Sequence, residues 1–153
     1  MAEGVGTDPM MAARFRALAL EGLGRPGAPE SLPDRILVVD PERQRLGLLE
    51  AGRLVLETMV STAANGLGCE ENSYKTPTGW HAAVGAVFRG RVVTGEVWRG
   101  EALDADLILS RVLTLEGLEA GWNQGPGRDS RERFIYLHGT NQEAALGQPV
   151  SHG

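Results

Sequence analysis

Glycine and proline divide this chain into short segments, and this division constrains the fold more than any other feature. The 153 residues include 21 glycines and 8 prolines, which is high for the length. Because both residue types interrupt helices and favour turns, their frequency favours short strands over a helical bundle. We therefore expect a mainly β fold, a sandwich of short mixed strands, with one short helix near the N-terminus.

Composition and charge exclude several classes of protein. Hydrophobic residues make up 42% of the chain, which is typical of a globular protein rather than a disordered one. The net charge of -5 argues against a nucleic-acid partner, because phosphate contacts need clustered lysine and arginine. No apolar run approaches the ~20 residues of a membrane span, and no signal peptide is evident. Nothing in the sequence indicates the oligomeric state.

Residues 1–33 are expected to form a tail, a short helix and a linker ahead of one domain, residues 34–153. An aspartate followed by proline is typical of a helix start, so Asp8 and Pro9 predict a helix that ends at Glu21. The glycines and prolines that follow predict an irregular linker.

Short strands and two long loops are predicted within the domain. Runs rich in β-branched and apolar residues, bounded by turn residues, are typical of strands. The first three should form an antiparallel meander, and two glycine-rich connections separate the later ones. The predicted strands span 36–39, 44–49, 54–61, 80–88, 91–98, 107–115 and 134–137, and the loops span 62–79 and 117–133.

The last stretch, residues 134–153, contains the most distinctive pattern. It reads FIYLHGTNQEAALGQPVSHG. An alternating run predicts a strand, with His138 at its end and a Gly-Thr-Asn turn after it. Catalytic residues are often placed on loops at the ends of scaffold strands, so His138 is a candidate catalytic residue.

Three motifs in this stretch resemble the active-site signature of the L,D-transpeptidase family, cell-wall enzymes with a cysteine nucleophile. They are HGTN at 138–141, GQP at 147–149 and SHG at 151–153. Upstream, VSTA at 60–63 and KTPTG at 75–79 add to the resemblance. It implies that the β sandwich is an L,D-transpeptidase-like catalytic domain.

The resemblance implies roles for five residues. His138 would accept the thiol proton, and the carbonyl of Gly139 would hold one ring nitrogen protonated and aim the other at the sulfur. Ser151, His152 and Gly153 would bind substrate, with N–H groups near His152 and Gly153 forming an oxyanion hole. The resemblance further implies peptidoglycan stem peptides as partners, no cofactor, and a location in the cell envelope or periplasm.

In that family the nucleophilic cysteine follows the Ser-His-Gly triplet directly, and an arginine comes shortly afterwards. The sequence ends at Gly153, so the nucleophilic cysteine is absent from it. We therefore expect a fragment of an active enzyme, incomplete at the C-terminus, and expect the 153-residue chain itself to be inactive.

Two other functions stay open at this point. A non-catalytic peptidoglycan-binding or scaffold protein could keep the same fold without the nucleophile. A cysteine hydrolase could instead pair Cys69, the single cysteine, with His138 or His81. No metal site is expected, because the spacing of the three histidines matches no compact zinc motif.

The second long loop, residues 117–133, has two interpretations. Trp122 and Arg128 could form part of a flap over the substrate groove. Alternatively, the loop is solvated, and Glu119 is one of the carboxylates that balance its arginines.

Overall fold

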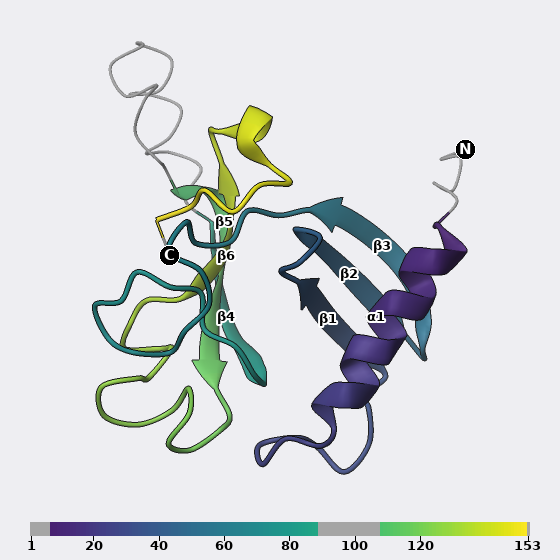
Figure 1. The fold of residues 1–153 in the computed structure, drawn as a ribbon, viewed down its shortest axis with the longest axis horizontal. Helices are drawn as coiled ribbons and strands as arrows, with labels where there is room; N and C mark the ends of the chain where they lie inside the picture. Colours follow the sequence, from purple (N-terminus) through teal and green to yellow (C-terminus); the bar gives the residue numbers. More distant parts are fainter. Residues whose placement is uncertain (1–6, 89–107, 153) are drawn as a thin grey trace.

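The computed structural model describes residues 7–88 and 108–152 of the protein. Within them the chain forms one α-helix and two three-stranded sheets, so the predicted mainly β fold with a helix near the N-terminus is confirmed (Figure 1). The strand predicted at 91–98 and the predicted site residue Gly153 lie outside the described residues.

Helix α1 (Pro9–Gly22) begins where the sequence predicts and ends one residue later than expected. The side chain of Asp8 accepts a hydrogen bond of 2.9 Å from the N–H of Met10, which caps the helix. The linker that follows contains turns and bends but no helix or strand, as predicted.

One face of α1 packs on the first sheet and supplies the centre of its core. Phe15 is fully buried there. A side chain at Gly47 would place its Cβ 2.6 Å from the Phe15 ring, so the missing Cβ allows the helix this close. Helix α1 precedes residue 34 yet contributes Phe15 to the core of the first sheet. The predicted domain boundary at residue 34 stays a prediction. The buried cluster consists of Phe15, Ala19, Val38, Leu49 and Leu54.

The first sheet is the antiparallel meander that the sequence predicts. Its strands are β1 (Arg35–Asp40), β2 (Arg45–Glu50) and β3 (Arg53–Met59), in the order β1-β2-β3. The turn between β2 and β3 has Ala51 at φ 46° and Gly52 at φ 75°. Two consecutive left-handed residues are typical of a tight hairpin turn, which matches the twist of the strands.

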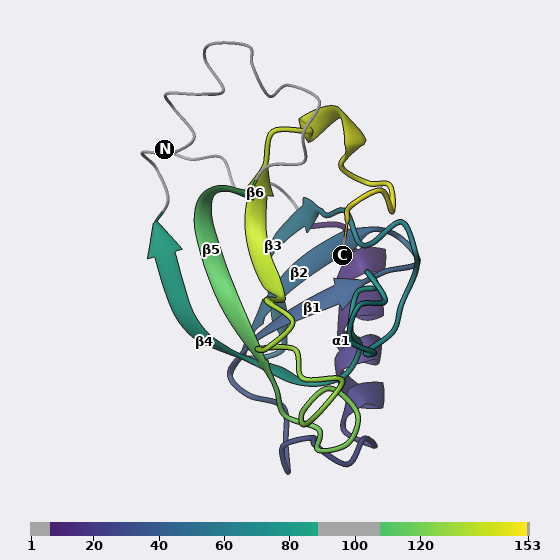
Figure 2. The ribbon, with the colours of Figure 1, turned by 90° about the vertical axis from the view of Figure 1, so that its left-hand side faces the viewer.

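The second sheet is also antiparallel, in the order β4-β5-β6 (Figures 1 and 2). It contains β4 (His81–Phe88), β5 (Ile108–Gly117) and β6 (Tyr136–Thr140). The strands predicted at 80–88 and 107–115 correspond to β4 and β5. Each pairing contains one register shift, so the strands are not perfectly regular.

The predicted position of the last strand is wrong by about two residues. Strand β6 starts at Tyr136, so His138 is its third residue rather than the residue at its end. The cause is Phe134, which adopts φ 59° and so cannot continue a strand. The predicted Gly-Thr-Asn turn is also wrong, because Gly139 and Thr140 still belong to β6.

Two long irregular loops connect these elements, as the glycine-rich segments predict. Residues 60–80 join β3 to β4, and residues 118–135 join β5 to β6. After β6 a short 3-10 turn, η2 (Glu143–Ala145), leads into the C-terminal segment. Among the helices that the structure describes, none is long and apolar enough to cross a bilayer.

Candidate active site

A cleft of about 1230 Å³ lies between the two sheets. Apolar residues from both sheets form much of its wall, including Leu37 and Val39 on β1 and Leu115 and Leu137 on the second sheet. Residues of both long loops and of the C-terminal segment complete the lining. We call this space the inter-sheet cleft.

His138 lines the inter-sheet cleft from β6 and is exposed. Its Nδ1 lies 2.7 Å from the carbonyl oxygen of Gly139. A carbonyl oxygen can only accept a hydrogen bond, so this contact places the ring proton on Nδ1. In the neutral ring the lone pair is then on Nε2, which is the arrangement that a general base needs.

The other predicted site residues lie in the C-terminal segment. Ser151 lines the same cleft as His138. His152 is exposed and does not belong to the described lining of the cleft, and Gly153 lies outside the described residues. The structure therefore brings His138 and Ser151 to one cleft from two different parts of the chain.

The KTPTG motif borders the cleft and supports a neighbouring loop. Thr76, Pro77 and Thr78 all line the cleft. The Thr76 hydroxyl accepts a hydrogen bond of 2.9 Å from the N–H of Ala63. Gly79 has φ 96°, a backbone conformation that side chains rarely adopt, so the glycine of this motif is required by the turn.

Glu119 is the main residue of this region that the sequence did not reveal. It is 2% exposed, and its carboxylate accepts hydrogen bonds from Arg25 Nε at 2.9 Å and from the N–H of Trp80 at 2.7 Å. The prediction that Glu119 balances the arginines of its own loop is wrong. Its ion pair is with Arg25 of the linker, and the Arg25 guanidinium also lies 5.1 Å from the centre of the Trp122 ring.

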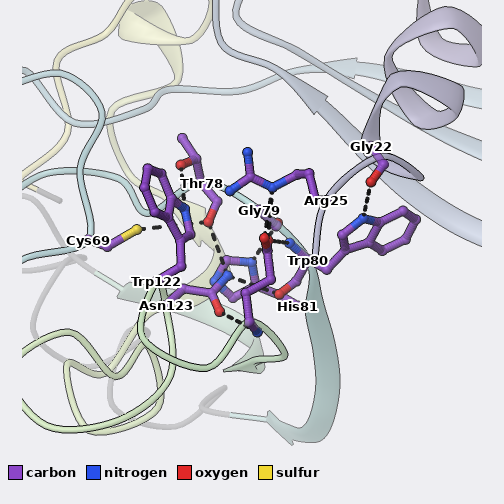
Figure 3. A network of polar contacts seen from close by, with 10 residues as sticks. Gly22, Arg25, Cys69, Thr78, Gly79, Trp80, His81, Trp122 and Asn123 are labelled. Atoms are coloured by element: carbon purple, nitrogen blue, oxygen red, sulfur yellow. Dashed lines mark hydrogen bonds and ion pairs between the residues drawn. The ribbon is translucent and has the colours of Figure 1, made fainter. Parts of the chain in front are cut away.

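Asn123 joins the two long loops through its fully buried side-chain amide. The amide nitrogen donates to the carbonyl oxygens of Thr78 and Trp80, both at 3.0 Å (Figure 3). The amide oxygen accepts from the N–H of Glu119 at 2.9 Å. A single asparagine in a charged loop carries no sequence signal for such a role, because the role depends on contacts with residues more than 40 positions away.

His81 lines the inter-sheet cleft from β4, but both of its ring nitrogens have protein partners. Nδ1 lies 3.0 Å from the carbonyl oxygen of Gly79, and Nε2 lies 2.8 Å from the hydroxyl of Ser130, which is fully buried. Burial lowers the pKa of His81, although the Gly79 carbonyl and the Glu119 carboxylate oppose this effect. The neutral ring, with its proton on Nδ1, therefore accepts a hydrogen bond at Nε2 from the hydroxyl of Ser130.

Trp122 and Arg128 do not line the inter-sheet cleft. They line a separate pocket of about 230 Å³ together with Cys69. The indole N–H of Trp122 donates to the hydroxyl of Thr78 at 3.2 Å, and Arg128 donates to the carbonyl oxygen of Gly121 at 2.6 Å. These contacts fix the loop, so in this structure the two residues do not act as a flap over the inter-sheet cleft.

Cys69 is buried in that separate pocket, at 4% exposed. Its sulfur lies 3.9 Å from the carbonyl oxygen of Thr78. A Cys69–His81 dyad is not formed, because the ring nitrogens of His81 contact Gly79 and Ser130 instead. His138 lines the inter-sheet cleft rather than the Cys69 pocket, so the structure gives no support to a Cys69–His138 dyad either.

No group of three or more histidine, cysteine, aspartate or glutamate side chains could hold a metal ion, as far as the described residues extend. The expectation that the domain needs no metal stays a prediction.

Comparison with known proteins gives one match. Residues 34–153 match the model of the YkuD family, described as the L,D-transpeptidase catalytic domain. The match begins at residue 34, where the predicted domain begins, and covers most of the chain. No curated protein and no solved structure matches the chain.

Proposed function

Because the chain belongs to the family of L,D-transpeptidase catalytic domains, we propose that it transfers acyl groups between peptidoglycan stem peptides through a cysteine acyl-enzyme. In the family pattern the nucleophilic cysteine directly follows the Ser-His-Gly triplet, the position after Gly153. The reaction would take place in the cell envelope, where peptidoglycan lies.

The observation that carries this proposal is the contact between His138 and Gly139 on the wall of the cleft. The 2.7 Å distance from Nδ1 to the carbonyl oxygen fixes the tautomer that a general base needs. Ser151, three residues before the proposed nucleophile, lines the same cleft. A thiol placed just after Gly153 would then be brought to the cleft that His138 lines.

The proposed chemistry has two steps. Nε2 of His138 takes the thiol proton, and the thiolate attacks the carbonyl carbon that precedes the terminal D-alanine of a tetrapeptide donor. N–H groups near His152 and Gly153 stabilise the oxyanion. The C–N bond breaks, His138 returns the proton to the leaving D-alanine amine, and a thioester remains.

In the second step the amine of an acceptor attacks the thioester carbonyl. His138 accepts the amine proton, the new peptide bond forms, and the thiolate leaves and is protonated. Proton transfer by a positioned side chain contributes roughly 10²–10⁴-fold to such rates, so His138 would be responsible for a large part of the acceleration.

The test uses a carbapenem, because these antibiotics typically acylate the cysteine nucleophile of this family. The chain is compared with a version extended by the family's Cys-x-Arg and closing strand, and both are measured by intact mass after incubation. We expect one covalent adduct on the extended protein and none on the 153-residue chain. Replacement of the added cysteine by serine is the matched control, and it should abolish the adduct.

Two results would contradict the proposal. An adduct on the 153-residue chain would show that Cys69 is the reactive thiol. A folded extended protein that forms no adduct, yet still sediments with purified peptidoglycan, would favour the non-catalytic binding function instead.

A further inference from the structure

Residues 60–64 lie alongside residues 147–151 and pair with them in parallel. The N–H of Gly147 donates to the carbonyl oxygen of Val60 at 3.0 Å, and the N–H of Ser151 donates to that of Thr62 at 3.0 Å. The N–H of Ala64 donates back to the carbonyl oxygen of Ser151 at 2.9 Å. The position of Ser151 is therefore set by residues 60–64, which contain the VSTA motif.

A side chain strengthens the same pairing. The hydroxyl of Ser61 donates to the carbonyl oxygen of Gln148 at 2.7 Å and accepts from the N–H of Val150 at 3.3 Å. Because main-chain and side-chain bonds alternate along the two segments, a shift of residues 60–64 would shift the C-terminal segment with them.

Gln44 also forms hydrogen bonds with residues 60–64. Its side chain is 4% exposed, and it lies in the turn between β1 and β2 at φ 52°. The amide oxygen accepts from the N–H of Thr62 at 2.8 Å, and the amide nitrogen donates to the Thr62 hydroxyl at 2.7 Å. The same nitrogen donates to the carbonyl oxygen of Pro41 at 2.7 Å, and the main-chain oxygen of Gln44 accepts from the N–H of Val60 at 2.9 Å.

These contacts use the amide oxygen and both amide hydrogens of a buried side chain. Thr62 presents its backbone N–H as a donor and its hydroxyl oxygen as an acceptor. The glutamine amide has the complementary acceptor and donor on one planar group. Methionine has a similar length but can make none of these bonds, and a glutamate would set a carboxylate against the carbonyl oxygen of Pro41. The site therefore selects an amide.

We propose that Gln44 is a positioning residue that fixes Thr62 and, through the pairing of residues 60–64 with 147–151, sets the place of Ser151 in the inter-sheet cleft. Gln44 does not line the cleft, whereas Thr62 and Ser151 do, so it acts through them. The structural part of this inference is independent of the activity. Its catalytic consequence rests on the proposed function, in which the nucleophile closely follows Ser151.

Amide hydrogen exchange in the 153-residue chain tests the structural part. In the Gln44→Met variant we expect the amides of Ser151, Gly147 and Ala64 to exchange at least tenfold faster than in the unmodified chain. The amide of Leu115, which bonds to Ile135 at 3.1 Å in the second sheet, should change much less. If Gln44→Met raises the exchange rates of all four amides by the same factor, or raises none of them, the proposal is overturned.

The control is Val38→Ala, which removes buried volume beneath α1 and destabilises the domain without touching residues 60–64. It should not single out the Ser151, Gly147 and Ala64 amides. If Gln44→Met does not fold, Thr62→Val replaces it, because valine keeps the shape and the N–H but loses the hydroxyl. Thr62→Ser restores the hydroxyl and should return the exchange rates toward those of the unmodified chain.

Acylation of the extended protein by a carbapenem tests the catalytic part. We expect Gln44→Met to lower the rate of acylation at saturating carbapenem about tenfold, and Val38→Ala to leave this rate within about twofold. Equal rates in Gln44→Met and the parent would overturn the catalytic part. An extended parent protein that forms no adduct would refute the proposed function instead, and the exchange experiment would still test the role of Gln44.

Discussion

Two histidines lie on the wall of the same cleft, and they share one local contact. In both, Nδ1 lies close to the carbonyl oxygen of a nearby glycine, 3.0 Å for His81 and 2.7 Å for His138. Beyond that contact their surroundings differ. The ring of His81 is largely covered and its Nε2 contacts a buried hydroxyl, whereas His138 is exposed on β6.

The comparison shows that the glycine carbonyl fixes a tautomer but does not by itself make a catalytic base. Around His81, the side chains of Glu119 and Asn123 form hydrogen bonds that connect the linker after α1 with the two long loops, and we call this set the Glu119–Asn123 network. No buried side-chain polar atom among the described residues lacks a partner. Such a network stabilises one arrangement of the loops, and both ring nitrogens of His81 already have protein partners, so neither is available to accept a proton from a substrate. Around His138 the neighbouring loops carry the family motifs. The same contact therefore serves a structural role at one site and, in our proposal, a catalytic role at the other.

The largest expected effect is on the rate of acylation when each of the two histidines is replaced by glutamine in turn. In the extended protein, His138→Gln should slow acylation by a carbapenem by roughly 10²–10⁴-fold, because glutamine cannot accept the thiol proton. His81→Gln should slow it by less than about tenfold, since that ring is not the proposed base. The measurement is the rate of adduct formation by intact mass, with circular dichroism to confirm that both variants are folded.

This pair of variants can break the comparison directly. Equal losses in the two variants would mean that the cleft needs both rings for its shape, and that exposure does not distinguish the base. Full activity in His138→Gln would remove His138 from the mechanism.

The next largest effect concerns the Glu119–Asn123 network near His81. Glu119→Ala should lower the free energy of unfolding by about 2–4 kcal/mol, because Arg25 and the N–H of Trp80 lose a buried acceptor. The matched control is Glu50→Ala, which breaks the exposed Arg35–Glu50 ion pair and should cost less than about 1 kcal/mol. Urea denaturation of both variants gives the comparison. If the two variants lose the same free energy of unfolding, the Glu119–Asn123 network does not stabilise the fold as its contacts indicate.

The elements that the sequence predicted well are those with local signals. Asp8 and Pro9 mark the start of α1, and the two residues at 51 and 52 mark a hairpin, because caps and turns depend on neighbours in the chain. The motifs at 138–141 and 151–153 identified a site because their residue types recur together in one family. The predicted position of His138 at the end of its strand was wrong by about two residues, because the left-handed conformation of Phe134 has no sequence signal.

The residues that the sequence did not reveal are those whose roles depend on distant contacts. Glu119 finds its partner 94 positions away in Arg25, and Gln44 finds its partner 18 positions away in Thr62. In a linear sequence both are polar residues in segments where polar residues are common. Only the fold brings them together, and burial then makes each hydrogen bond matter.

The smallest effect is a pH dependence that His81 should give to stability. Burial lowers its pKa below the ordinary 6.5 in the folded protein, so the unfolded chain binds a proton at higher pH than the folded one does. The free energy of unfolding should therefore fall as the pH drops through 6.5 and continue to fall until the folded ring also titrates. One proton limits the slope to about 1.4 kcal/mol per pH unit, and His81→Gln should reduce it. Urea denaturation between about pH 7.5 and 5.5 measures the slope, and equal slopes in the two proteins would show that His81 titrates alike in the folded and unfolded chain.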